Sequence, residues 1–366
     1  MKNNILFILH FPPPVHGSSM IGQSIKNSKI INDTFDCRYI NLLVSRTINE
    51  TGKPSSLKVM RFMRVWFKVL AEIIKKKPDV CYLALTAKGA AFYKDVLLVA
   101  LLRAFQIKRV YHLHNKGFSR IKTTKIDDFF YRYVFKDADI ILLSSQLYSD
   151  IKAFVPPSRI SICPNGIVDT ILNFKPQTVV KEKPVKIMFL SNLCESKGVF
   201  VLLEACSVLQ KKGIDFECDF IGAEGDLDAI KFSEKVKQHK LASNVKYLGK
   251  KFDKDKQDVF ESTDIFIHPT LSDCFPLVLL EAMQYSLPVV STFEGGISDI
   301  VEDGTTGYLV PQKNVEALAE KLEVLIKNPD QRQQMGLAGR QKYEKEFTLN
   351  AFELRLRNIL QEVLDK

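Results

Sequence analysis

Short apolar runs alternate with stretches of helical periodicity along most of the chain. An apolar run bounded by turn residues is typical of a strand buried on both faces of a sheet, whereas an apolar stripe with a period of about 3.6 residues indicates a helix. Strands that alternate with helices predict a parallel sheet covered on both faces. In the first half the pattern predicts strands at 5–9, 37–40, 79–85, 108–114, 139–143 and 159–162, and helices at 18–30, 57–77, 88–105 and 126–135.

The second half repeats this alternation. Residues 164–184 lack periodicity and carry proline near both ends, and within them we expect a linker at 171–184. The fold class is therefore α/β, with two Rossmann-like doubly wound domains at 1–170 and 185–348 that face each other across a cleft. The predicted strands are 185–190, 216–221, 245–248, 265–267 and 288–291, and the predicted helices are 198–211, 227–240, 254–262, one that opens at 275–277, and 314–327, 330–344 and 349–364.

Length and composition agree with two globular domains. The chain has 366 residues, of which 46% are hydrophobic and 26% charged. The longest clean apolar run, 96–102, is far shorter than the roughly 20 residues that a membrane span requires. Residues 1–14 contain an early histidine and end in three prolines, so we interpret them as a first strand rather than a signal peptide. The seven cysteines are scattered, which favours reduced thiols and a cytoplasmic location.

The formal net charge of +10 is concentrated on one predicted helix. Eight basic residues lie between Lys53 and Lys77, against Glu72 alone. One interpretation is an ordinary helix that packs an apolar stripe on the sheet while its lysines stay in water. The other is a contact with an anionic membrane surface at the inner face of the membrane. Nucleic acid is not expected as a partner, because basic and aromatic residues do not interleave along a groove. The predicted buried stripe comprises Val59, Phe62, Met63, Trp66, Leu70 and Ile73.

The residues with the most suggestive chemistry lie at 264–310. A short strand is followed by Asp273, by the turn Phe275–Pro276–Leu277 that opens a helix, and by Glu281 inside that helix. The first backbone N–H groups of a helix are unpaired and favour phosphate, while carboxylates accept hydrogen bonds from sugar hydroxyls. The alternative is that Asp273 only caps the helix and Glu281 is a solvated helix residue.

This stretch resembles the retaining glycosyltransferases of family four, which have the GT-B fold. Their E-x7-E motif is present here as Asp273 and Glu281, with the first glutamate shortened by one methylene. The resemblance implies that Asp273 contacts the donor sugar beside the reacting carbon and that Glu281 holds the nucleotide ribose. Phe275, Pro276 and Leu277 would bind the donor diphosphate at the helix start.

Other positions of the chain extend the resemblance. Lys197, just before Gly198, matches the family's lysine and would neutralise the diphosphate, whereas Asn192 stands where an arginine is usual. Gly222 follows a strand, near the nucleotide in the family.

In the first half, Gly17 and Ser18 match a glycine-rich loop at the diphosphate and the acceptor. His114 ends a strand and would lie near the donor sugar. His112, two positions earlier on the same face, suits a core role.

The resemblance therefore implies a cytoplasmic hexosyltransferase that takes a sugar from a UDP- or GDP-linked donor. It would retain the anomeric configuration and act on a glycan or lipid-linked acceptor in surface polysaccharide biosynthesis. No cofactor or essential metal is expected. The first domain would bind the acceptor, the second the nucleotide sugar, and the last helix at 349–366 would cross back to the first domain. Two alternatives stay open, a nucleotide-sugar epimerase on the same scaffold and a non-catalytic protein that binds nucleotide sugars or polyanions.

Overall fold

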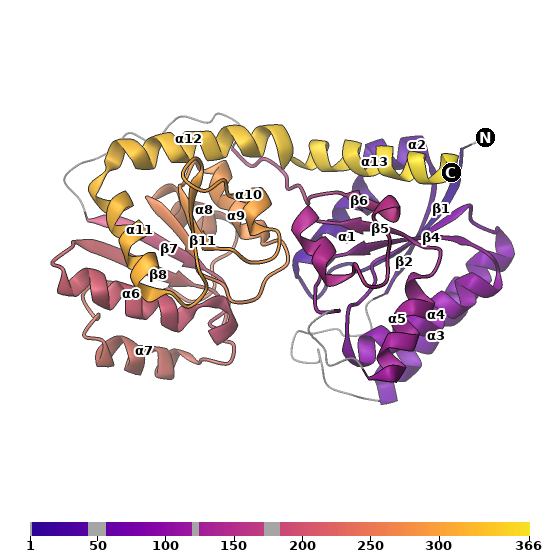
Figure 1. Ribbon diagram of the computed structural model, residues 1–366, viewed down its shortest axis with the longest axis horizontal. Helices are drawn as coiled ribbons and strands as arrows, with labels where there is room; N and C mark the ends of the chain where they lie inside the picture. Colours follow the sequence, from indigo (N-terminus) through magenta and orange to yellow (C-terminus); the bar gives the residue numbers. More distant parts are fainter. Residues whose placement is uncertain (1, 43–55, 119–123, 172–183) are drawn as a thin grey trace. The chain divides into compact units, whose positions relative to one another are not determined.

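The computed structural model describes residues 2–42, 56–118, 124–171 and 184–366, and the chain divides into two compact units (Figure 1). The first unit comprises Met1–Gly166 together with Leu349–Lys366. The second comprises Ile167–Thr348. Most of the predicted linker lies outside the described residues. No helix in the described ranges is both long enough and apolar enough to cross a membrane.

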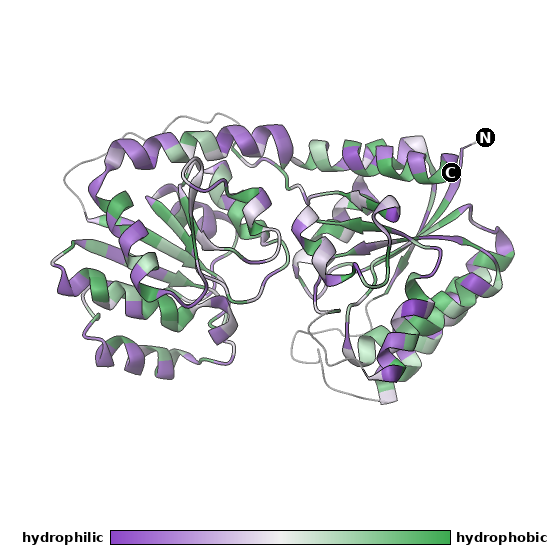
Figure 2. Ribbon diagram, in the orientation of Figure 1, coloured by the Kyte–Doolittle hydropathy of each residue, from purple (hydrophilic) through white to green (hydrophobic). Residues whose placement is uncertain are grey.

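The first unit is built on a parallel sheet in which six described strands are ordered β2-β1-β3-β4-β5-β6. β1, β3 and β5 are buried along their whole length, which explains why their sequences are continuous apolar runs. Figure 2 shows this as mostly hydrophobic colouring along the strands. The strands are β1 (Asn4–Leu9), β2 (Asp36–Asn41), β3 (Val80–Leu83), β4 (Lys108–Leu113), β5 (Asp139–Leu142) and β6 (Ile160–Ile162).

Helices cover this sheet. The predicted single helix at 18–30 is wrong, because the chain forms two helices that share Ser28 as a junction. Ser28 is extended and its hydroxyl accepts a hydrogen bond from the Ile31 N–H at 3.2 Å, which starts a new helix. The helices are α1 (Gly17–Asn27), α2 (Lys29–Thr34), α3 (Ser56–Lys75), α4 (Gly89–Ala104), α5 (Lys125–Phe135) and α13 (Leu349–Asp365), with 3-10 turns η2 (Ser145–Asp150) and η3 (Pro157–Arg159).

The face that α3 buries differs from the predicted one. Its buried side chains are Phe62, Val69 and Ile73, whereas Val59 is 63% exposed and Met63 is 38% exposed. Residues seven and eleven positions apart lie on one side of a helix, so Phe62, Val69 and Ile73 form a single row toward the core. The rest of the predicted stripe is turned away from the core or lies at its margin.

The second unit has its own parallel sheet, in which six described strands are ordered β12-β11-β10-β7-β8-β9. Helices α6, α7 and α11 join the inward side chains of these strands in one hydrophobic cluster. The strand β12 and the short helix α10 were not predicted, since four residues give too little pattern. The strands are β7 (Val185–Leu190), β8 (Phe216–Ile221), β9 (Val245–Tyr247), β10 (Ile265–His268), β11 (Val289–Thr292) and β12 (Gly307–Val310).

The order of these strands reverses between β7 and β10, which are the two neighbours at the centre of the sheet. In doubly wound sheets the loops that leave the carboxyl ends at such a reversal hold the ligand. The predicted α/β fold class with two Rossmann-like sheets is confirmed. The remaining elements are η4 (Glu195–Lys197), α6 (Val199–Lys211), α7 (Ala229–Gln238), α8 (Asp253–Glu261), α9 (Leu277–Gln284), α10 (Ile297–Ile300), α11 (Val315–Lys327) and α12 (Pro329–Glu346).

The junctions between the two units differ slightly from the expected boundaries. Residues 167–170, expected in the first domain, pack with the second unit. The guanidinium of Arg340 donates to the Asp169 carboxylate at 2.5 Å, and the Tyr343 hydroxyl donates to the Ile167 carbonyl at 3.1 Å. At the other junction, α13 belongs to the first unit, where Lys108 Nζ donates to the Val363 carbonyl at 2.5 Å.

Candidate functional site

The loops that follow β7 and β10 bring Lys197 and Asp273 together. Lys197 Nζ lies 2.6 Å from Asp273 Oδ2 and also donates to the Ser272 carbonyl at 3.2 Å. The two residues are 76 positions apart in the chain, but β7 and β10 are hydrogen-bonded neighbours, so their carboxyl ends meet. A cation and a carboxylate thus stand at the reversal point of the sheet.

Asp273 is held as a carboxylate by its surroundings. Burial acts to raise the pKa of Asp273, but the His268 imidazole and the Lys197 ammonium outweigh it, and the pKa lies well below its usual range. His268 Nε2 is 3.5 Å from Asp273 Oδ2. The other carboxylate oxygen, Oδ1, accepts a hydrogen bond from the Cys274 N–H at 2.8 Å. The side chain therefore keeps its negative charge in a partly buried position.

The loop at 294–296 fixes the backbone around Asp273. The Asp273 N–H donates to Glu294 Oε1 at 3.2 Å, and the Gly296 N–H donates to the Cys274 carbonyl at 2.7 Å. Gly295 has a φ of +55°, and a Cβ there would lie 2.4 Å from the Asp273 carbonyl oxygen. Only glycine permits this close approach, so the loop after β11 clamps the loop after β10.

Helix α9 begins beside Asp273 without a side-chain cap. Its N-cap is Pro276, and Asp273 does not cap it, so the alternative interpretation of Asp273 as a helix cap is wrong. Phe275 and Pro276 are buried, while Leu277 is partly exposed. The Leu279 N–H donates to the Pro276 carbonyl at 3.2 Å, so the N–H groups that this helix start leaves without an acceptor in the helix are those of Leu277 and Val278. They provide the positive end of a helix dipole a few residues after Asp273, which is the partner of Lys197.

Glu281 lies in α9 and is paired with a residue that the sequence pattern did not single out. Lys256 Nζ of α8 is 2.7 Å from Glu281 Oε2. The Glu281 side chain is 28% exposed. The interpretation of Glu281 as a merely solvated helix residue therefore fails, because its carboxylate is held by a cation.

Asn192 and Gly222 follow β7 and β8, whose ends also meet. The Ser191 N–H donates to the Ile221 carbonyl at 2.9 Å. Gly222 has a φ of +148°, and a Cβ there would lie 1.9 Å from the Ser191 carbonyl oxygen. Gly222 thus allows the two loops to touch, and the Asn192 side chain remains exposed beside them.

In the first unit, Gly17 and Ser18 start α1, after the loop that leaves β1. The cap of this helix is His16, whose Nδ1 accepts a hydrogen bond from the Ser19 N–H at 3.3 Å. Ser18 Oγ lies 3.1 Å from His16 Nδ1.

Three histidines gather at the carboxyl ends of β1 and β4. The rings of His10 and His16 are 6.0 Å apart, and His114 is close enough to both to influence them. Burial, with Lys94 and the other two histidines, lowers the pKa of His10 to about 3. Burial, and then His16, lowers the pKa of His114 to about 4. His10 and His114 are therefore neutral near pH 7, and the buried Nδ1 atom of each has no hydrogen-bond partner among the residues that the structure describes.

His112 has the core role that was expected. It is fully buried, its Nδ1 is hydrogen-bonded to the Tyr82 hydroxyl, and its ring lies 4.2 Å from the His114 ring. The His112 ring therefore packs against the His114 ring and helps to fix its orientation.

The predicted residues fall into one group in each unit. Gly17, Ser18 and His114 lie in the first unit, and the other predicted residues lie in the second. Sequence reasoning gave no role to four further residues: His10, Lys256, His268 and Glu294. Three of them stand at or just beyond the carboxyl end of a strand, a position that could have drawn attention to them. Lys256 carries no such signal, because its pairing with Glu281 depends on how α8 packs.

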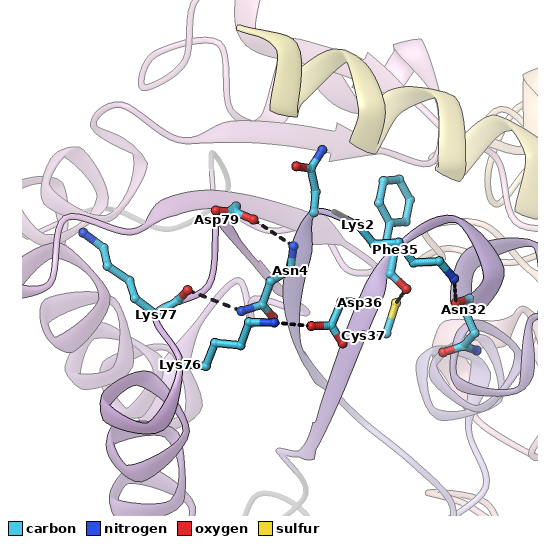
Figure 3. A pocket seen from close by; sticks show the side chains of 10 residues that line it. Lys2, Asn4, Asn32, Phe35, Asp36, Cys37, Lys76, Lys77 and Asp79 are labelled. Atoms are coloured by element: carbon cyan, nitrogen blue, oxygen red, sulfur yellow. Dashed lines mark hydrogen bonds and ion pairs between the residues drawn. The ribbon is translucent and has the colours of Figure 1, made fainter.

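A cavity of about 720 Å³ lies elsewhere in the first unit (Figure 3). It opens at the amino ends of β1 and β2 and near the start of β3, which is the edge of the sheet opposite to the histidines. Two of its charged side chains pair with each other, as Lys76 Nζ lies 2.5 Å from Asp36 Oδ2, and the Asp79 carboxylate accepts a hydrogen bond from the Asn4 N–H at 2.8 Å. The position is not the one at which doubly wound sheets hold ligands. Among the described residues, no cluster of three or more His, Cys, Asp or Glu side chains is arranged to hold a metal ion.

Comparison with known proteins gives this geometry a context. The family model described as glycosyl transferases group 1 matches residues 171–342. The amylovoran biosynthesis glycosyltransferase AmsK of Erwinia amylovora is 30% identical over 325 residues, which cover 84% of this chain and 78% of AmsK. The putative colanic acid biosynthesis glycosyltransferase WcaL of Escherichia coli is 28% identical over 244 residues, or 63% of this chain and 58% of WcaL.

Solved structures show the same architecture. HepE from Anabaena, crystallised in complex with UDP, aligns with a TM-score of 0.76 at 18% identity, covering 99% of this chain and 100% of HepE. Its complex with UDP-glucose aligns with a TM-score of 0.74, also at 18% identity, over 98% of this chain and 99% of HepE. This likeness confirms the predicted GT-B fold class.

Proposed function

The chain belongs to the glycosyl transferases group 1 family, and from that premise we propose that it transfers a hexose-type sugar from a nucleotide-diphosphate donor, with retention at the anomeric carbon. The acceptor in this proposal is a glycan or a lipid-linked saccharide. The observation that carries it is the Lys197–Asp273 pair beside the uncapped start of α9.

The charges at this point suit a donor whose leaving group is a diphosphate. Lys197 and the first N–H groups of α9 supply positive potential for the two phosphates. Such groups stabilise the negative charge that grows on a departing phosphate more than they stabilise the bound donor. Asp273, kept ionised by Lys197 and His268, faces the sugar and orients its hydroxyls.

The proposed reaction balances without an added reagent. The bond between the anomeric carbon and the diphosphate oxygen breaks, and a bond from the same carbon to an acceptor oxygen forms on the same face of the sugar. The proton of the acceptor hydroxyl passes to the leaving phosphate. Glu281, held by Lys256, accepts hydrogen bonds from the ribose of the nucleotide.

Neutral His10 and His114 suit uncharged groups in the first unit. A neutral imidazole has one hydrogen-bond donor and one acceptor, and a sugar hydroxyl can pair with either. His114 thus contacts the donor sugar, and Gly17 and Ser18 bring backbone N–H groups and a hydroxyl to the diphosphate and the acceptor.

The relatives narrow the choice of substrates. AmsK and WcaL are described as glycosyltransferases of amylovoran and colanic acid biosynthesis, and a capsular polysaccharide glycosyltransferase, CapM of Staphylococcus aureus, is 25% identical over 69% of this chain and 70% of CapM. HepE binds UDP and UDP-glucose in its crystals. We therefore favour a UDP-hexose donor, a growing surface polysaccharide as acceptor, and work at the cytoplasmic face of the membrane.

A thermal-shift panel with UDP, GDP, ADP and their sugars tests the nucleotide. A ligand at 100 times its Kd stabilises the native protein by about 2.7 kcal/mol, so a matching nucleotide raises Tm by several degrees. We expect UDP to do so and ADP not to. The positive donor is then incubated with and without lipid-linked acceptors, and products are resolved by mass spectrometry. Sugar inversion without acceptor would establish the epimerase, and binding without transfer or hydrolysis would establish a binding protein.

A further inference from the structure

Most of the exposed large apolar side chains that the structure describes in the first unit lie on three helices. A typical soluble surface has such side chains singly, whereas a contiguous group indicates a contact surface. Figure 2 shows hydrophobic and hydrophilic residues mixed along these helices, which Figure 1 labels. The group comprises Leu57, Val59, Met60, Met63, Phe67 and Ile74 of α3, Tyr93 and Leu97 of α4, and Ile126 and Phe129 of α5. We call it the α3–α5 face.

The exposed apolar residues of α3 form a stripe of their own. Met60, Met63, Phe67 and Ile74 are spaced by three, four and seven positions, so they lie on one side of the helix. Their exposed fractions are 47%, 38%, 58% and 69%. The stripe is distinct from the buried row that contains Phe62 and Ile73, so packing on the sheet does not explain it.

Contacts between helices make the face continuous. Trp66 Nε1 of α3 donates to the Leu97 carbonyl of α4 at 3.3 Å, and the Trp66 ring lies 5.2 Å from the Phe67 ring. One turn earlier on α4, the Tyr93 ring lies 5.6 Å from the Phe130 ring of α5. Phe130 is in turn 5.4 Å from Phe129. The apolar side chains therefore run from α3 across α4 to α5.

A basic row borders this face. Arg64, Lys68 and Lys75 are exposed and lie four and seven positions apart, on one side of α3 next to the apolar stripe. In the part of the chain that the structure describes, none of these three side chains has an ion-pair partner. On α5, Asp128 is engaged by Arg132 at 2.8 Å. The Asp127 carboxylate of α5 accepts a hydrogen bond from the Tyr93 hydroxyl and adds one negative charge to the face. The three basic side chains of α3 outnumber it, so the charge beside the apolar stripe is net positive.

We propose that the α3–α5 face docks on the surface of an anionic lipid bilayer. The apolar side chains enter the boundary between headgroups and acyl chains, while Arg64, Lys68 and Lys75 contact lipid phosphates. Surface-bound amphipathic helices have this combination of an apolar stripe and a basic border. The basic row selects anionic lipid over a neutral surface and over a second copy of this basic chain, whose own charge is +10.

Vesicle co-sedimentation of the full chain tests the proposal without any donor or acceptor, so its result is independent of the proposed function. The vesicles contain phosphatidylcholine alone or phosphatidylcholine with phosphatidylglycerol. We expect binding to the anionic vesicles only, and weaker binding as salt rises. Equal binding to both compositions, or binding to neither, overturns the proposal.

Two variants separate the contributions of charge and apolar contact. Arg64→Gln/Lys68→Gln/Lys75→Gln removes the basic row and lowers affinity for anionic vesicles by roughly fivefold per charge, about 100-fold in all. Phe67→Ser/Ile74→Ser keeps the charge and lowers affinity by at least about tenfold. Since all five side chains are exposed, both variants keep the Tm of the wild type.

Matched controls come from α7 in the second unit. Lys235→Gln/Lys237→Gln and Ile230→Ser change exposed residues of the same kinds and leave vesicle binding unchanged. A loss of binding in these controls as large as in the α3 variants contradicts the assignment to the α3–α5 face. Light scattering adds a final arm. A dimer that Phe67→Ser/Ile74→Ser dissociates would show that a second copy covers the face, which also overturns the proposal.

Discussion

At the residue scale, the site depends on the contact between Lys197 and Asp273. Each residue could be selected from the sequence on its own, as a lysine before a glycine and as an acidic residue before a helix. Their 2.6 Å contact could not be predicted, because it depends on β7 and β10 being neighbours in the sheet. The same holds for Lys256 and Glu281, which meet only after α8 and α9 have packed.

Substitutions of this pair are expected to separate binding from turnover. Asp273→Asn removes the charge that faces the sugar and lowers kcat by about 10²–10³, while UDP binding is kept. Lys197→Ala weakens UDP binding as well, because the diphosphate loses its cation. Initial rates and titration calorimetry with UDP give the two quantities.

Lys212→Ala is the control for these variants, since Lys212 forms an ion pair of similar length, 2.7 Å, with Glu323 away from the site. It should leave both quantities unchanged. Wild-type turnover in Asp273→Asn and Lys197→Ala would mean that the reaction takes place elsewhere.

The neutral histidines make the stability of the first unit dependent on pH. The pKa values of His10 and His114 lie at about 3 and about 4 in the native protein, below the value near 6.5 of an unfolded chain. As pH falls from 6.5 toward 4, the unfolded state takes up protons that the native state does not. The free energy of unfolding therefore decreases, by up to about 1.4 kcal/mol per pH unit for each histidine.

Denaturant titrations between pH 7 and 4.5 measure this slope. The double variant His10→Asn/His114→Asn should reduce the slope of the free energy of unfolding against pH, even if the variant also changes stability at pH 7. His239→Asn, at the end of α7, should leave the slope unchanged. An unchanged slope in the double variant would show that other groups cause the loss of stability.

At the scale of elements, the sequence predicted strands and helices well where apolar runs were long. It failed where a local contact decides the outcome, as at Ser28, whose hydroxyl starts a new helix. It also failed on the orientation of α3, because a broad apolar surface does not reveal which part of it faces the core. Periodicity identifies a helix, but packing selects the side that is buried.

Replacing a glycine at the site should cost more stability than its positive φ alone explains, because an added Cβ would clash with the backbone of a neighbouring loop. Gly198 has a φ of +81°, and a Cβ there would lie 2.0 Å from the Pro269 carbonyl oxygen, at the join of the Lys197 and Asp273 loops. Gly213 has a φ of +70° with nothing within 4 Å of such a Cβ. Gly213→Ala should cost only the conformational term of about 1–2 kcal/mol, whereas Gly198→Ala adds a backbone clash and costs several kcal/mol.

Chemical denaturation of the two glycine variants makes this comparison, and UDP affinity should fall only in Gly198→Ala. If Gly198→Ala and Gly213→Ala lost the same free energy of unfolding, the loops around Pro269 would be able to move apart without destabilising the protein.

At the scale of the whole molecule, two parallel sheets and the return of the last helix to the first unit were expected from the sequence, and the sheets are confirmed by the structure. The boundaries between the units were harder to predict. Asp169 belongs to the second unit because Arg340 binds its carboxylate and Tyr343 binds the neighbouring Ile167 carbonyl. A few motif residues were enough to indicate the family. The contacts between those residues could be seen only once the fold was known.

The two units should respond separately to core substitutions. Leu356 of α13 and Leu322 of α11 are both fully buried, one in each unit. Replacing either with alanine costs about 2–5 kcal/mol. Hydrogen exchange should then rise in β1 and α2 for Leu356→Ala, and in β7 and α6 for Leu322→Ala. Faster exchange throughout both units in either variant would contradict this division.

The placement of α13 also affects how the protein is made. A ribosome delivers residues 2–166 first, but α13, which packs against α2, follows only after the whole second unit has been translated. The second unit is continuous in sequence and can close its core as soon as it emerges. Until then the nascent first unit presents the apolar surface that Phe352, Leu356 and Leu360 will later cover, and transiently exposed surface of this kind is prone to aggregate.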